Sequence, residues 1–116
     1  MELNILRADP AGNITVFVLD PVEKAQRAAI AEKIMAIPEL KAEQVGYACA
    51  AEDDVDGHME MMGGEFCGNA TRAYGMYIAQ QKGGLSAVKL RVSGCDHAVT
   101  AQVDLKSGTA RAEMPC

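Results

Sequence analysis

The chain has 116 residues, of which 49% are hydrophobic and 23% are charged, with 11 Gly and 4 Pro. This length and composition predict one folded domain with a modest core and exclude a disordered or fibrous chain. The 16 acidic and 11 basic side chains give a net charge of -5, which disfavours nucleic acid as a partner. The sequence has no apolar run long enough to span a membrane and no signal-peptide pattern at its start, so we expect a cytoplasmic protein without membrane contact.

The first third of the chain predicts a hairpin followed by a helix. Two apolar runs, residues 3–7 and 14–19, flank a turn-forming segment. Next, Asp20 is a capping residue, Pro21 suits the first helical position and Glu23 completes a capping pattern. We therefore expect an outer amphipathic helix over about residues 21–36. Its sheet-facing side should comprise Val22, Ala25, Ala29, Ile30 and Ile34, with Arg27 and the other charged residues pointing elsewhere.

The rest of the chain predicts strands around a second helix. Residues 44–51 and 58–62 are expected strands, joined by an acidic, solvated turn that lacks the ligand spacing of a calcium loop. A helix over about residues 69–81 carries apolar side chains in nearly all directions, which is typical of a central buried helix. Three further strands are expected at residues 87–92, 98–105 and 109–114. The fold class is therefore α+β.

The cysteines and histidines provide no conventional pattern for a disulfide framework or a metal site. The four cysteines are widely spaced and form no CxxC pair, so we expect mostly reduced thiols. Three of them, Cys49, Cys95 and Cys116, are expected to have no catalytic role. The two histidines, His58 and His97, stand too far apart for metal-ligand spacing, so no metal site is expected.

One segment, residues 63–72 (GGEFCGNATR), combines features suited to proton transfer. Its glycine-rich turn delivers Cys67 to the start of the second helix, where unpaired backbone N–H groups and the helix dipole favour a thiolate. The same N–H groups can bind a carboxylate, and Gly68 permits close backbone approach. Such a base is suited to removing the α-proton of an amino acid. The plainer alternative makes Cys67 a small buried residue and Asn69 a helix cap.

Residues 65–72 resemble the E-x-C-G-N-[GA]-x-R segment of the diaminopimelate epimerase-like superfamily of cofactor-independent racemases and epimerases. Upstream, residues 12–16 (GNITV) resemble the early G-N-D-F-type segment of that superfamily. The forms of both segments are most similar to the histidine racemases of opine-metallophore biosynthesis, with a weaker likeness to the phenazine-biosynthesis isomerases.

The resemblance implies a barrel-like, mostly antiparallel sheet around a central helix, duplicated as two pseudo-symmetric domains with the active site between them. It implies that each domain supplies one catalytic cysteine, as thiolate base or thiol acid, without pyridoxal phosphate or metal. Cys67 would be one of the pair. Gly68 and Asn69 would contact the substrate carboxylate, and Asn13 would contact the amino acid.

Departures from the superfamily pattern concern the substrate and the second thiol. Ile14 and Thr15 stand where diaminopimelate epimerases have an aspartate and an aromatic residue, which argues against diaminopimelate as substrate. No second cysteine lies in a motif like the superfamily's C-terminal one, and one thiol covers one face of a stereocentre. We therefore expect residues 1–116 to be the N-terminal catalytic half of a two-domain racemase, inactive without a C-terminal domain that supplies the second cysteine.

Three alternatives remain open from the sequence. A phenazine-type isomerase would use an acidic or histidine acid/base, for which Glu65 and His58 are candidates. A noncatalytic half-domain would bind a partner or a second copy of itself through the face that a second domain would cover. A thiol redox sensor would need a resolving cysteine near Cys67.

Overall fold

The computed structural model describes residues 4–9, 14–52 and 54–112. Within them, seven strands form one sheet in chain order and two helices pack on it. The strands are β1 (Ile5–Ala8), β2 (Thr15–Val18), β3 (Gln44–Cys49), β4 (Gly57–Met61), β5 (Ala87–Val92), β6 (Val99–Asp104) and β7 (Thr109–Ala112). The helices are α1 (Lys24–Met35) and α2 (Gly68–Gln81). No helix in these ranges is long and apolar enough to cross a membrane.

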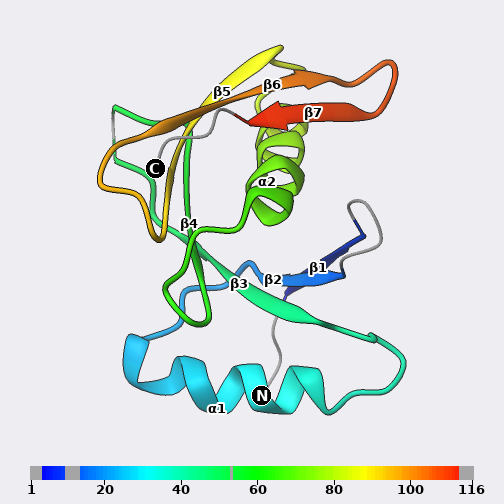
Figure 1. Ribbon diagram of the computed structural model, residues 1–116, viewed down its shortest axis with the longest axis vertical. Helices are drawn as coiled ribbons and strands as arrows, with labels where there is room; N and C mark the ends of the chain where they lie inside the picture. The colour runs from blue at the N-terminus through cyan, green and yellow to red at the C-terminus, as the bar shows by residue number, and fades with distance from the viewer. Residues whose placement is uncertain (1–3, 10–13, 53, 113–116) are drawn as a thin grey trace.

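The sheet is mostly antiparallel, with two parallel neighbours. The parallel pairs are β2 with β3 and β4 with β5. A parallel pair needs a crossover connection, and α1 provides it for the first pair and α2 for the second. Figure 1 shows the sheet curled around α2, with α1 lying outside it. The expected α+β class is confirmed, as a curled half-barrel of seven strands with two helices.

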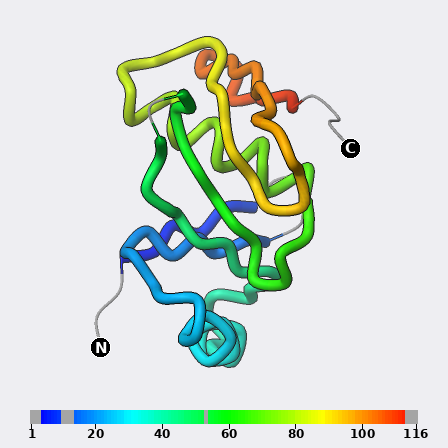
Figure 2. The backbone as a smooth tube through the Cα atoms, turned by 90° about the vertical axis from the view of Figure 1, so that its left-hand side faces the viewer, coloured from blue at the N-terminus to red at the C-terminus, as the bar shows by residue number. Residues whose placement is uncertain are grey.

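The two helices pack on opposite faces of the sheet and create two cores. Alternation along β2 directs Val16 and Val18 towards α1, whereas Phe17 joins the core around α2. On β4, Met59 and Met61 likewise face the α2 core. Figure 2 shows α1 seen nearly along its axis, beneath the strands and separate from α2. Outward-facing side chains of β3 and β4 therefore lie on the α1 face of the sheet.

The start of α1 differs from its prediction. The helix begins at Lys24 rather than near residue 21, and Glu23 occupies the N-cap with extended backbone and no side-chain cap bond. The carboxylate of Asp20, expected to cap the helix, instead accepts hydrogen bonds from the backbone nitrogen of Asn4 at 2.6 Å and from its side-chain nitrogen at 3.1 Å. Asp20, which follows β2, is therefore hydrogen-bonded to Asn4, which precedes β1, and closes the open end of this hairpin.

The buried face of α1 also differs from the predicted one. Ile30, Ala31 and Ile34 are buried, whereas Ala25 and Ala29 are exposed, because the helix contacts the sheet through its second half. Arg27, expected to point away, is half-buried and forms an ion pair with Glu60 on β4. The outer helix is thus present, but the amphipathic character expected of it is weak, because only three of its residues are buried.

The second helix and most strand positions match their predictions. α2 starts one residue before the predicted position and ends where expected. Its sheet-facing residues are buried, and the other side is half-buried rather than fully enclosed. The buried residues are Ala70, Thr71, Tyr74, Gly75, Ile78 and Ala79. The described strands lie within two residues of the predicted ranges, and the end of the last predicted strand falls outside the described residues.

Candidate active site

Cys67 forms the N-cap of α2. Its backbone is extended, with φ -131° and ψ 112°, and its Sγ accepts a hydrogen bond from the Ala70 amide at 3.5 Å. The Cys67 carbonyl oxygen accepts from both the amide of Thr71, at 2.9 Å, and its hydroxyl, at 2.8 Å. Thr71 is fully buried, so these bonds fix the cysteine backbone to the helix. The expected thiol at a helix start is therefore present.

The backbone amides beside the thiol are available to a ligand. The first amides of a helix have no intrahelical acceptor, and here they belong to Gly68 and Asn69. Within the described ranges, neither amide donates a hydrogen bond. The positive end of the α2 dipole adds to their attraction for an anion. Among the described residues, a half-buried thiol and two backbone amides with no hydrogen-bond acceptor thus share one helix start.

Asn69 and Arg72 form a pair on the first turn of α2. The side-chain oxygen of Asn69 accepts a hydrogen bond from the guanidinium of Arg72, three residues later. The plain alternative of Asn69 as the helix cap is therefore wrong, because Cys67 holds that position. Arg72 is half-buried, and its guanidinium lies beside Gly68, 3.5 Å from where a β-carbon on that glycine would stand.

The loop that carries Cys67 is braced by the turn between β5 and β6. The Ser93 hydroxyl donates to the carbonyl oxygen of Glu65 at 2.6 Å and accepts from the Met61 amide at 2.8 Å. Gly94, with φ +80°, lies directly against the backbone of Phe66. Residues 93–94 follow the predicted strand 87–92, and nothing local in the sequence indicates this role, because the contact joins segments far apart in the chain.

Glu65 and His58 are the other acid/base candidates that the sequence offers. Glu65 is exposed, and its carboxylate accepts from the Gly63 amide at 3.2 Å. His58 lies on the α1 face of the sheet, where its Nε2 is 3.3 Å from a Glu60 oxygen. It therefore cannot share a site with Cys67, which disfavours a His58-based isomerase. Asn13 falls outside the described residues.

Tyr74, on the next turns of α2, is not a competing base. Burial raises its pKa to about 12, so the phenol keeps its proton at neutral pH. Its ring packs against Phe17, with centroids 5.4 Å apart. Cys67 and Cys49 are both free thiols, and they lie on opposite faces of the sheet. Cys49 therefore cannot act as the resolving cysteine that a redox sensor based on Cys67 would need.

The fold and the site together define an α+β half-barrel domain with a thiol at the start of α2, the helix inside its curled sheet. The family model described as "Histidine racemase CntK N-terminal domain" matches residues 2–116, and the chain belongs to this family.

Curated relatives agree with the family match. A histidine racemase of Fusobacterium nucleatum subsp. nucleatum is 42% identical over 79 residues, which covers 66% of this chain and 27% of the relative. A histidine racemase of Staphylococcus aureus is 37% identical over 95 residues, covering 78% of this chain and 34% of the relative. The chain thus matches about a third or less of the length of these relatives.

Proposed function

We propose that this chain is the N-terminal half of a cofactor-independent histidine racemase and that Cys67 is one of its two proton-transferring thiols. The relatives that match it carry the name histidine racemase, and the matches cover one part of their length. The observation that carries the role of Cys67 is its place at the N-cap of α2, beside the amides of Gly68 and Asn69.

The reaction needs one group on each face of the α-carbon. The substrate carboxylate binds the amides of Gly68 and Asn69, which places the α-carbon near the Cys67 sulfur. In one direction the Cys67 thiolate takes the α-proton, and a thiol from the second half of the protein delivers a proton to the opposite face. In the other direction the roles reverse. One proton leaves and one arrives, so the reaction needs no electron donor or acceptor.

The proposal also covers the second domain and the remaining contacts to the substrate. The sheet curled around α2 supports a diaminopimelate epimerase-like domain, completed by a second such domain that covers the site. The positive charge of Arg72 stabilises negative charge that develops on the substrate carboxylate as the proton leaves. Asn69, oriented by Arg72, and Asn13 complete the contacts to the substrate. The second domain supplies the other thiol.

The test is histidine racemisation in the two-domain protein that contains this chain. We expect Cys67→Ser to remove racemisation in both directions, because each direction uses both thiols. Cys49→Ser, which removes a thiol on the opposite face of the sheet, serves as the matched control and should retain activity. Racemisation by Cys67→Ser at the parental rate would refute the role of Cys67. Racemisation of a different amino acid, with none of histidine, would refute histidine as the substrate.

A further inference from the structure

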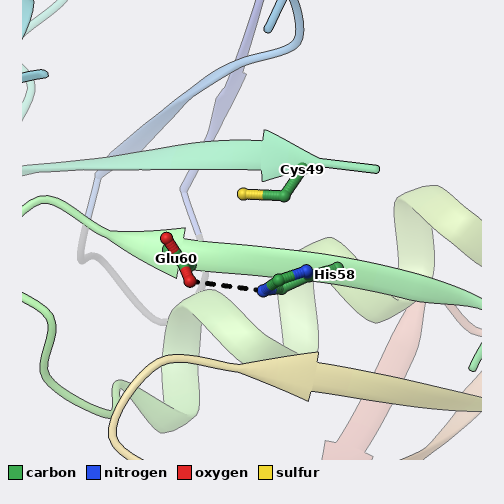
Figure 3. Close-up of side chains that lie close together, drawn as sticks. All are labelled: Cys49, His58 and Glu60. Carbon is green, nitrogen blue, oxygen red and sulfur yellow. Dashed lines mark ion pairs between the residues drawn. The ribbon is translucent and has the colours of Figure 1, made fainter. Parts of the chain in front are cut away.

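The α1 face of the sheet carries a second cluster of reactive side chains, separate from Cys67. Cys49 on β3 is the cross-strand partner of His58 on β4, and strand alternation places Glu60 on the same face. Figure 3 shows the three side chains directed towards one another. Their sulfur, nitrogen and oxygen atoms all lie within 4.8 Å of one another, and His58 Nε2 is 3.3 Å from Glu60 Oε2.

This donor set matches the ligands that zinc prefers. Cysteine sulfur, imidazole nitrogen and carboxylate oxygen bind zinc at about 2.0–2.3 Å in a tetrahedron, which puts neighbouring ligand atoms roughly 3.5 Å apart. The distance between His58 and Glu60 already fits this value. Rotation of the Cys49 side chain brings its sulfur the remaining way. We propose that Cys49, His58 and Glu60 form a three-ligand zinc site, with water as the fourth ligand.

The surroundings of the cluster leave room for that water. His58 and Glu60 line a cavity of about 610 Å³ between the sheet and α1. Their side chains are 21% and 25% exposed, so the site is partly shielded and still open to an incoming ion. Burial raises the pKa of the Cys49 thiol, and the neighbouring Glu60 carboxylate adds to this effect. Zinc binding therefore releases the thiol proton.

Arg27 competes with the metal. Its guanidinium is paired with Glu60, and its Nη2 lies 3.6 Å from the Cys49 sulfur, so a cation already faces two of the three ligands. The pair is well shielded, with side chains 17% and 25% exposed, so zinc has to displace the guanidinium into the cavity at a cost in free energy. Lys24 and Arg91 also line that cavity. Their positive charges predict a binding constant weaker than that of a structural zinc site, and tighter binding when Arg27 is neutralised.

The direct test is titration of the 116-residue chain with zinc against a chelating dye, with cobalt as a spectroscopic substitute. We expect one zinc ion per chain and a thiolate-to-cobalt absorption band. Cys49→Ser should remove the band, His58→Ala should weaken zinc binding by more than about tenfold, and Arg27→Leu should tighten it. The matched control is His97→Ala, which removes a histidine outside the cluster and should leave binding unchanged. A band that persists in Cys49→Ser, or binding that depends on His97, would overturn the proposal.

A second measurement needs no variant and is independent of how each variant folds. Iodoacetamide labelling of the unaltered chain, located by mass spectrometry, reports the accessibility of each thiol. Zinc should slow labelling of Cys49 by more than about tenfold and leave the labelling of Cys67 unchanged. Equal labelling of Cys49 with and without zinc would contradict the site, whatever the racemase activity of the protein.

Discussion

Gly94 lies so close to Phe66 that a β-carbon added to Gly94 would stand 2.3 Å from the Phe66 backbone nitrogen. Phe66 directly precedes Cys67, so the turn between β5 and β6 fixes the position of the thiol. Gly94 also has φ +80°, which is unfavourable for residues with a β-carbon. Two independent requirements therefore select glycine at this position, and both serve the geometry of the candidate active site.

Gly94→Ala should therefore destabilise the chain strongly. Strain from the left-handed backbone and the collision with Phe66 together predict a loss of about 2–4 kcal/mol in the free energy of unfolding. The measurement is urea denaturation. Gly108→Ala is the matched control, because Gly108 has φ +72° with nothing within 4 Å of its would-be β-carbon, and it should cost about 1 kcal/mol. Equal losses in the two variants would show that the contact with Phe66 is unimportant.

Gly75 sets the distance between α2 and β6. An added β-carbon would lie 2.8 Å from the β-carbon of Ala101, which is fully buried. Overpacking costs about 1–3 kcal/mol and outweighs the gain of up to about 1 kcal/mol from replacing a helical glycine by alanine. Gly75→Ala should therefore be destabilising on balance. Adding Ala101→Gly should recover part of the loss, and additive effects of the two changes in denaturation experiments would contradict direct contact.

The buried phenol of Tyr74 should make the free energy of unfolding depend on pH in the alkaline range. Burial raises its pKa from 10.0 to about 12, so the folded chain holds the phenol proton more tightly than the unfolded chain. The resulting stabilisation is complete below pH 10 and is lost as pH rises towards 12. Between pH 10 and 12, the free energy of unfolding should therefore fall by about 2–3 kcal/mol less in Tyr74→Phe than in the parent. Thermal denaturation at several pH values measures this difference. The same loss of stability between pH 10 and 12 in Tyr74→Phe and in the parent would contradict this origin.

Local patterns predicted most of the fold. Alternating apolar runs located the strands, and glycine turns separated them, because these signals depend on neighbouring residues. The predicted start of α1 was wrong because the Asp20 side chain can either cap a helix or accept hydrogen bonds from Asn4. The bonds to Asn4 form only once β1 and β2 pair, which the local sequence does not indicate. The burial of Arg27 depends on Glu60, which is 33 residues away in the sequence. Contacts of this kind leave no local signal.

The candidate site was predictable to the same extent. The helix start at Cys67 follows from a glycine-rich turn before a helical segment, and the structure confirms that position. The support from Ser93 and Gly94 comes from another turn and was missed. The proposed zinc ligands were missed for a similar reason. The spacing of His58 and His97 along the sequence indicates no metal site, whereas the neighbours of His58 in space are Cys49 on β3 and Glu60, two residues further along β4. Period-two alternation of both strands, combined with their pairing, was the signal that could have found it.

Isotope exchange shows whether Cys67 transfers the α-proton of histidine. L- and D-histidine are incubated in deuterium oxide with the two-domain protein, and deuterium at the α-carbon is followed by NMR together with racemisation. Cys67→Ser should slow racemisation by more than about 100-fold in both directions, and should abolish exchange from the enantiomer whose proton Cys67 removes. Racemisation and exchange at the parental rates in Cys67→Ser would mean that Cys67 does not transfer this proton.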